Sequence, residues 1–295
     1  AILAEGKRRL IEDPGRFAGV TTIGVDEHVW RHTRRGDRYV TVIIDLTPVR
    51  EKRGPARLLD MVEGRSKQVF KTWLEERSWA WRERIEVVAM DGFTGFKTAA
   101  QEVLPDAVPV MDPFHVVQLA GDALDRTRQR VQQETLGHRG RRGDPLYGVR
   151  RSLRTGEAFL TQKQHERLDA VFADPAHADV WRAWRVYQQV VAAYRERFSG
   201  NGRRRLRELI DVVRATTPAW FVELRKLGYT LERRRQDILA YFDHPRTSNG
   251  PTEAINGRLE HLRGSALGFR NLTNYIARSL LEAGGFRPLL HPQFR

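Results

Sequence analysis

Cysteine is absent from the 295-residue chain, and its absence excludes disulfide bonds and zinc sites built on thiolates. The sequence also contains no run of about 18 apolar residues, the length that a membrane-spanning helix requires. No secretory leader precedes the first predicted strand. From these absences we expect an intracellular protein without a membrane segment.

Acidic residues are the minority among the charged side chains. The chain has 37 Asp and Glu residues against 51 Lys and Arg residues, which gives a formal net charge of +14. Such an excess favours a nucleic acid or another polyanion as partner, because each neutralised phosphate releases counterions. A generally basic surface that serves only solubility is the alternative. Arginine dominates the basic clusters, and its planar fork suits phosphate, so we favour nucleic acid.

Two apolar runs near the start of the chain, Ile23–Trp30 and Tyr39–Leu46, predict paired strands joined by a basic turn at Arg34–Asp37. Asp26 interrupts the first run. A buried carboxylate costs several kcal/mol of solvation unless a cation or hydrogen bonds compensate it. A divalent metal ion is one candidate partner for Asp26, and a buried cation such as Arg31 is the other.

The order of the predicted elements indicates the fold class. A third strand is predicted at 56–62, and it is followed by a helix from Ser66 to about Arg77. Strands at 86–90 and 107–111 then alternate with helices at 94–104 and from Pro113 onward. Three consecutive strands followed by two strands that alternate with helices predict an α/β fold, a ribonuclease H-like mixed sheet flanked by helices.

The alternation of predicted strands and helices ends near Gly137. Beyond it the apolar residues recur with the spacing of amphipathic helices. We interpret this stretch as an all-helical insertion that precedes the last catalytic helix. Trp181, Trp184 and Trp220 lie in it, either as ordinary helical core, which their apolar neighbours favour, or as surfaces that stack on an unpaired base. The predicted domains are an N-terminal remnant or linker at 1–19, the first part of the core at 20–137, the insertion at 138–244 and the C-terminal part of the core at 245–295.

Three carboxylates occur where an open α/β sheet places ligands. Asp26 lies in the first strand, Asp91 follows a later strand directly before a glycine, and Glu253 lies in the first turn of the helix after the insertion. Hard oxygen ligands from separate elements suit Mg²⁺ or Mn²⁺. Two such ions would serve an in-line phosphoryl displacement, so the pattern predicts a nuclease or strand-transfer site.

Each of these carboxylates also has a purely structural interpretation. Asp91 is a candidate N-cap for the helix that begins near Phe93, and Glu253 is placed to bond the amides of its own helix. Asp112 also ends a strand, but Asp112-Pro113 is an ordinary helix start, so we rank it below Asp91 as a metal ligand.

Histidines supply weaker candidates. His115 follows Asp112 by about one helical turn and is a candidate supporting residue of the site. His28 and His32 are four residues apart in a strand and turn, which is not a metal-binding geometry, so we interpret them as structural or DNA-contacting residues.

Four sequence blocks carry a resemblance to a known family: GVDEHVWRHTRRGDRYVTVIIDL, VVAMDGFTGF, VMDPFHVVQLA and RTSNGPTEAINGRLEHLRG. In the same order they resemble the blocks of the ISL-three family of bacterial insertion-sequence transposases of the DDE class. The resemblance implies a ribonuclease H-like core with a helical insertion and a metal-bound triad at Asp26, Asp91 and Glu253. It further implies two Mg²⁺ or Mn²⁺ ions, cleavage of DNA at element ends, joining of 3′-hydroxyl ends to target DNA, a homodimer assembled on DNA, and a location in the bacterial cytoplasm.

Family members usually carry an N-terminal zinc segment and a helix-turn-helix, and this chain shows neither. We therefore expect the core to hold DNA through phosphate contacts with little sequence preference. The predicted contacts are Arg139, Arg141, Arg142, Arg150, Arg151, Arg154 and Arg258, and the predicted supporting residues of the site are Asp112, His115 and Asn256. Two other functions remain open: a ribonuclease H-like structure-specific nuclease such as a resolvase, and a non-catalytic DNA-binding derivative.

Overall fold

The computed structural model describes residues 2–32 and 38–286, so the predicted turn at Arg34–Asp37 lies outside the described residues. The chain divides into two compact units. The first, which we call the sheet unit, comprises Ala1–Asp112 and His244–Arg295. The second, the helical unit, comprises Pro113–Asp243.

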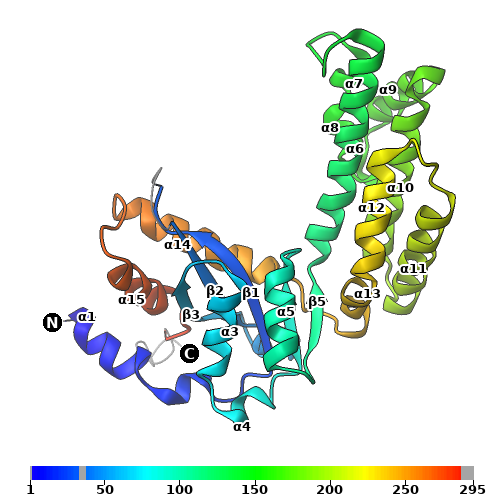
Figure 1. Ribbon diagram of the computed structural model, residues 1–295. Coiled ribbons are helices and arrows are strands. Elements are labelled where there is room, and N and C mark those ends of the chain that lie inside the picture. Colours follow the sequence, from blue (N-terminus) through cyan, green and yellow to red (C-terminus); the bar gives the residue numbers. More distant parts are fainter. Residues whose placement is uncertain (1, 33–37, 287–295) are drawn as a thin grey trace. The chain divides into compact units, whose positions relative to one another are not determined.

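A five-stranded sheet with the strand order β3-β2-β1-β4-β5 forms the centre of the sheet unit (Figure 1). Strands β1 (Thr22–Val29), β2 (Tyr39–Asp45) and β3 (Arg57–Glu63) pair antiparallel as a meander. Strands β4 (Val87–Met90) and β5 (Val108–Met111) extend the sheet on the other side of β1, and each pairs parallel with its neighbour. This topology confirms the predicted ribonuclease H-like class.

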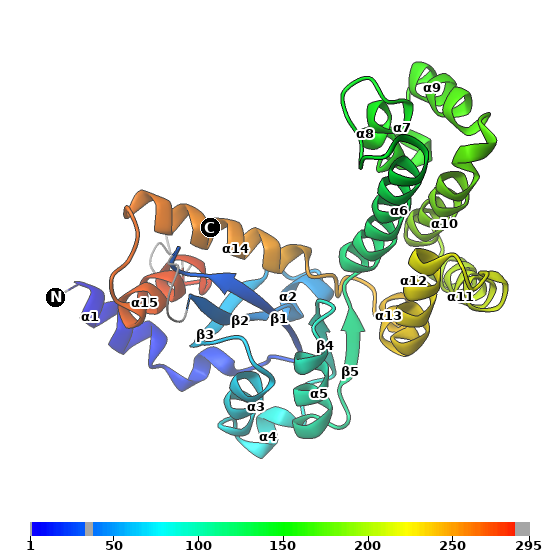
Figure 2. The same cartoon turned by 45° about the horizontal axis from the view of Figure 1, so that its top comes forward.

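Helices cover both faces of the sheet (Figure 2). On one face lie α3 (Lys67–Glu75), α4 (Trp79–Arg82) and α5 (Thr94–Val103), which bury Phe70, Trp73 and Phe96 against β1 and β4. The predicted start of this helix at Ser66 is confirmed, because Ser66 is the N-cap of α3 and its hydroxyl accepts a hydrogen bond from the Val69 amide at 3.2 Å.

The other face carries the helices that follow the helical unit. Here α14 (Gly250–Ser265) and α15 (Leu272–Ala283) bury Ile255, Leu259 and Tyr275 against β2 and β3. The two faces receive alternate residues of β1, as the strand period requires. The remaining short elements of the sheet unit are α1 (Ile2–Gly6), the π-helix η1 (Lys7–Ile11), the 3₁₀ helix η2 (Pro14–Phe17) and α2 (Thr47–Arg50).

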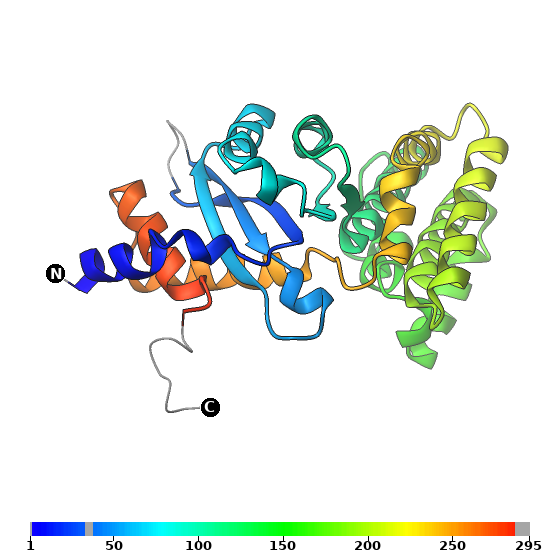
Figure 3. The same cartoon turned by 90° about the horizontal axis from the view of Figure 1, so that it is seen from below.

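The helical unit contains helices of very different length, and Figure 3 shows the longer ones side by side. Its elements are α6 (Pro113–Leu136), α7 (Pro145–Gly148), α8 (Arg150–Leu153), η3 (Glu157–Phe159), α9 (Gln162–Phe172), η4 (Pro175–His177), α10 (Ala178–Arg195), α11 (Ser199–Thr216), α12 (Val222–Arg233) and α13 (Arg235–Asp243). No strand interrupts them in this part of the described chain.

The helical unit begins earlier than the predicted insertion. The predicted boundary placed residues 113–137 in the first part of the core and the start of the insertion at 138. In the structure the helical unit begins at Pro113 and includes all of α6. The reason is the apolar stripe of α6, which includes Ala120, Leu124 and Val131 and is buried. Helix α6 packs on α10 and α12, which belong to the same unit. None of the described helices combines the length and apolar character needed to cross a lipid bilayer.

Candidate active site

Asp26 and Asp91 lie beside each other at the level of the sheet where β4 ends. Val25 on β1 is the register partner of Met90 on β4, so Asp26 and Asp91 are the next residues of two adjacent parallel strands. Asp112 extends the row, because Met111 on β5 is the partner of Met90. The backbone amide of Asp112 also donates to the Met90 carbonyl at 2.9 Å.

A glycine in β1 brings the helix of Glu253 close to the sheet. A Cβ placed on Gly24 would lie 3.0 Å from the Thr252 hydroxyl oxygen and 2.8 Å from Ile44 Cγ1, so only glycine permits this approach. Thr252 is fully buried in the first turn of α14, while its neighbour Glu253 is exposed. Gly24 and Asp26 share one face of β1, so this approach places Glu253 near Asp26.

Asn256, one turn further along α14, contacts Asp26 directly. Its side-chain amide donates to Asp26 Oδ2 at 3.1 Å, and the backbone amide of Glu27 donates to Asp26 Oδ1 at 2.8 Å. Asn256 Oδ1 is buried and has no hydrogen-bond partner among the described residues. The predicted supporting residue therefore contacts the candidate site, and it leaves a buried acceptor oxygen free there.

The pKa of Asp26 shows the electrostatic character of the site. Burial raises this pKa from 3.8 to about 7, and the hydrogen bond from the Glu27 amide opposes the rise. The negative charges of Asp91, Glu27 and Glu253 raise the pKa further. Because carboxylates repel over distances of several ångströms, the effect places Asp91 and Glu253 near Asp26. We call Asp26, Asp91 and Glu253 the carboxylate edge.

The alternative of a buried cation beside Asp26 finds no support in the contacts. No described cation forms a salt bridge with Asp26, and the guanidinium of Arg31 lies instead over the Trp30 ring, 4.7 Å from its centroid. The structural interpretation of Asp91 is partly met, since Asp91 Oδ1 accepts from the Phe93 amide at 2.8 Å. For Glu253, no hydrogen bond from its own helix is present among the described residues, and the side chain is exposed.

Asp112 anchors the chain segment that leads into α14. The Asp112 side chain is buried, and its Oδ1 accepts from the Asn249 amide at 2.7 Å. The side chain of Asn249 in turn accepts from the Thr252 hydroxyl at 2.5 Å. Asp112 thus fixes the start of the helix that carries Glu253. His115, the other predicted supporting residue, lies in the first turn of α6 in the helical unit.

The donor set fits a divalent cation in its chemistry. Among the described residues, no three His, Cys, Asp or Glu side chains are gathered tightly enough to enclose a metal ion, so the carboxylates would have to move closer to share one. Two observations favour a cation: the negative charges of Asp91 and Glu253 act on the buried Asp26, which has no paired cation among the described residues, and the buried Asn256 Oδ1 lacks a partner there. Hard oxygen donors of this kind suit Mg²⁺ or Mn²⁺.

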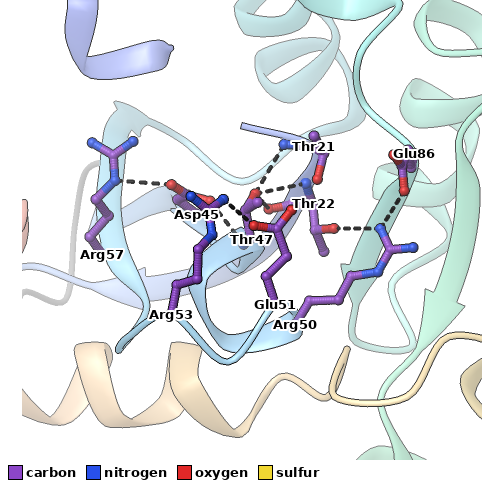
Figure 4. A network of polar contacts seen from close by, with 9 residues as sticks. All are labelled: Thr21, Thr22, Asp45, Thr47, Arg50, Glu51, Arg53, Arg57 and Glu86. Carbon is purple, nitrogen blue, oxygen red and sulfur yellow. Dashed lines mark hydrogen bonds and ion pairs between the residues drawn. The ribbon is translucent and has the colours of Figure 1, made fainter. Parts of the chain in front are cut away.

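Acidic residues at the opposite end of the central strands are paired with arginines (Figure 4). Asp45 is buried, and its two oxygens accept from Arg57 Nε and the Thr47 amide, each at 2.9 Å. Glu86 accepts from Arg50 Nη1 at 2.6 Å. We call these pairs, Asp45 with Arg57 and Glu86 with Arg50, the arginine edge.

The arginines predicted to contact DNA fall into two groups: some are exposed to solvent, and others contact side chains of this protein. Five are exposed: Arg139, Arg141, Arg142 and Arg151 in the helical unit and Arg258 on α14. Arg150 lies over the Tyr147 ring, 4.0 Å from its centroid, and donates to the Tyr147 carbonyl. Arg154 lies 3.4 Å from Asp122 and 3.5 Å from Asp125, so a phosphate would have to compete with these carboxylates.

The two histidines of the first block have different surroundings. His28 is buried, its Nε2 lies 2.8 Å from the Tyr275 hydroxyl, and burial lowers its pKa to about 4. This environment gives His28 a structural place in the core. His32 is exposed and lies 2.9 Å from Arg263 Nη2.

Three residues that position α14, Gly24, Asn249 and Thr252, were not among the residues predicted from the sequence. One signal was available for Gly24, because a glycine inside an apolar strand often marks the close approach of another segment. The connection from Asp112 to Asn249 spans the whole helical unit and leaves no local pattern in the sequence.

The protein has a ribonuclease H-like sheet with an acidic row at the ends of its parallel strands. A helical unit is inserted before the last of these acidic residues. These features are the ones expected of the DDE class of transposases. Residues 23–279 match the model of the ISL-three family of DDE transposases, described as "Transposase". The chain belongs to this family.

The chain is also similar to individual transposases. It is 27% identical over 304 residues to "Transposase for insertion sequence element IS1557" from two strains of Mycobacterium tuberculosis, CDC 1551 / Oshkosh and ATCC 25618 / H37Rv. The match covers 94% of this chain and 64% of the length of those relatives. A solved structure, "Drosophila P element transposase strand transfer complex", aligns with 11% identity and a TM-score of 0.47, covering 92% of this chain and 78% of that chain.

Proposed function

We propose that this chain is the catalytic core of a transposase that cleaves DNA at insertion-sequence ends and joins the 3′-hydroxyl ends to target DNA. Membership of a transposase family supports the substrate class. The observation that carries the chemistry is the carboxylate edge, where Asp26, Asp91 and Glu253 interact electrostatically with no cation paired to Asp26. In this proposal the three carboxylates hold two Mg²⁺ or Mn²⁺ ions. Bound there, the ions would activate the attacking oxygen and stabilise the leaving oxygen of the phosphodiester.

The protein's own residues have distinct tasks in this proposal. Asp26 is fixed in the sheet, and the Asn256 amide orients one of its oxygens. Glu253 is presented by the first turn of α14, which Asp112 and Asn249 hold against the sheet. Exposed arginines, including Arg258, neutralise DNA phosphates. Positioning and charge neutralisation are the main requirements of phosphoryl transfer, and this arrangement provides both.

The decisive experiment replaces Asp91 with Asn and measures Mg²⁺-dependent nicking of DNA that carries the element ends. We expect nicking to fall by about 10³-fold, since the ions contribute several kcal/mol and each 1.4 kcal/mol is about tenfold in rate. Asp106→Asn is the matched control, because Asp106 is exposed and lies before β5, at the other end of that strand from Asp112. Undiminished nicking by Asp91→Asn would remove this residue from the triad.

A strand-transfer assay with precut ends distinguishes transposition from simple cleavage. A transposase joins a precut 3′-hydroxyl end to a second duplex, whereas a structure-specific nuclease cleaves without joining. Retained DNA binding with neither cleavage nor joining, and with no change in melting temperature on Mg²⁺ titration, would indicate a non-catalytic DNA-binding derivative. Assembly as a homodimer on DNA is part of the proposal, and sedimentation of the protein with and without end DNA measures it.

A further inference from the structure

A groove in the helical unit combines exposed aromatic side chains with arginines. It lies between α10, α11 and the start of α12, with a volume of about 500 Å³. Trp181 from α10 and Trp220 from the turn before α12 line it, and they are 45% and 56% exposed. Val212 on α11, 54% exposed, contributes to the same surface. Large apolar side chains gathered at one exposed place indicate a binding surface.

The sequence of α10 separates this surface from the core. Val180, Trp184 and Tyr187 form the buried stripe of the helix. Trp181 and Arg185 are four residues apart on another face and both line the groove. The interpretation of these tryptophans as core therefore holds for Trp184 and fails for Trp181 and Trp220.

The charge of the groove is complementary to phosphate. Its lining includes Arg182 and Arg185 and no Asp or Glu. Arg185 is exposed and forms no salt bridge with any described residue, while Arg182 lies 3.3 Å from Asp179. Asp179 also pairs with Arg130 at 2.9 Å. The groove thus combines apolar side chains with the guanidinium of Arg185, which has no salt-bridge partner among the described residues.

Trp220 is held in a fixed orientation. Its ring stacks on the buried Phe221, with 5.6 Å between centroids and an interplanar angle of 5°. One face of the indole is thereby occupied, and more than half of the side chain stays exposed to solvent. A rigid, solvated aromatic face of this kind suits stacking with another planar ring.

We propose that this groove binds an unpaired nucleobase of the DNA substrate against Trp181 and Trp220, with the adjoining phosphate held by Arg185. The inference rests on the proposed function for its DNA partner and adds a subsite for a base that has left the duplex. Stacking platforms combined with arginines are the general means of holding single-stranded nucleic acid. A volume of about 500 Å³ lies in the usual range of small-ligand pockets, roughly 300–1,000 Å³.

The test compares two fluorescent single strands of equal length: an oligothymidylate, and a strand in which every nucleotide is abasic. They carry the same number of phosphates and differ only in bases. In metal-free buffer, fluorescence anisotropy should show that the whole chain binds the oligothymidylate about tenfold more tightly, which corresponds to about 1.4 kcal/mol. Trp181→Ala and Trp220→Ala should each lower this preference severalfold and leave the affinity for the abasic strand unchanged.

Further variants separate stacking from phosphate binding. Trp181→Phe and Trp220→Phe should retain most of the preference, because a phenyl ring still stacks. Arg185→Ala should weaken both strands equally and reduce the salt slope by about one unit. Trp79→Ala is the matched control, since Trp79 is 67% exposed and belongs to the sheet unit. Tyr229→Ala, 63% exposed on α12, is the control within the helical unit.

A second measurement needs no change in the groove. In the Trp79→Phe protein, oligothymidylate should protect tryptophan fluorescence from acrylamide quenching, and the abasic strand should not. Equal affinity of the wild-type chain for both strands would overturn the subsite while leaving DNA binding intact. Alanine variants that change self-association but not base preference would also overturn it, because a second copy would then cover the groove. Failure to bind either strand would contradict the DNA partner of the proposed function itself.

Discussion

Acidic residues at the two ends of the central strands have different charged partners. At the arginine edge, Asp45 and Glu86 each form an ion pair with an arginine, and Asp45 also caps the turn at Thr47. At the carboxylate edge, Asp26 has no paired cation among the described residues, and burial, together with the negative charges of Asp91 and Glu253, raises its pKa to about 7. One sheet thus contains acidic residues that are paired with arginines and, at the other end of its strands, a buried carboxylate that has no paired cation in the described part of the chain.

The contrast favours a structural role for the acidic residues of the arginine edge and supports the proposed ligand-binding role of the carboxylate edge. A buried carboxylate that only stabilises a fold acquires a cation or several donors, as Asp45 does. A carboxylate that is kept beside like charges costs stability, and such a cost concentrates at functional sites. The absence of a paired cation at the described carboxylates of this edge is therefore what supports the proposed site.

The largest expected effect is on activity. Asp26→Asn should lower Mg²⁺-dependent DNA cleavage by about 10³-fold, since several kcal/mol of metal-derived stabilisation would be lost. Asp45→Asn removes a carboxylate of the same sheet and should leave the rate of the folded protein within about threefold, because the arginine edge touches no reacting group. Initial nicking rates at equal folded concentration check this pair. Comparable losses for both variants would remove the distinction between the two edges.

The same two substitutions should change stability in opposite directions. Asp45→Asn breaks the pair with Arg57 and should lower the free energy of unfolding by about 2 kcal/mol. Asp26→Asn removes an uncompensated buried charge and should raise it by about 1–2 kcal/mol in chelated protein at pH 8. Urea unfolding measures both values. A destabilised Asp26→Asn protein would mean that a cation already compensates this carboxylate.

A change at Gly24 should damage the carboxylate edge without removing any of its charges. In Gly24→Ala the new methyl group would lie 2.8 Å from Ile44 Cγ1 and 3.0 Å from the Thr252 hydroxyl. We expect a loss of about 1–3 kcal/mol from overpacking and slower cleavage, because α14 and Glu253 must move. Gly257→Ala on the same helix is the control for stability, since no atom lies within 4 Å of its new Cβ. That variant should gain about 0.5–1 kcal/mol from helix propensity.

The smallest expected effect is the pH dependence of the Asp26 contribution in metal-free protein. The folded-state pKa is about 7 and the ordinary pKa of an aspartate is 3.8, so the folded state binds the proton more tightly and stability falls as pH rises between these values. The difference in urea midpoint between wild type and Asp26→Asn should be near zero at about pH 4. It should then grow up to about pH 7 and stay constant above. A difference that does not vary with pH would contradict the raised pKa.

The sequence predicted those parts of the molecule that local patterns encode. Apolar runs, some of them only four residues long, indicated every strand of the sheet, and Asp26 stood out because it interrupts one of these runs. The contact between Gly24 and Thr252 joins segments on either side of the helical unit, and no local pattern encodes such a contact. The assignment of α6 depended on its packing partners, because periodicity shows which face of a helix is buried but not against what. The triad and its ions stay a prediction, which the variants above test.

The place of the helical unit in the chain has a consequence for biosynthesis. Asp26 and Asp91 leave the ribosome first, and all of Pro113–Asp243 must be translated before Glu253 appears. At roughly 5–20 residues per second, this delay lasts on the order of ten seconds. Under the proposed triad, a nascent or prematurely terminated polypeptide that stops before Glu253 has only two of the three carboxylates, so such a fragment should not cleave DNA.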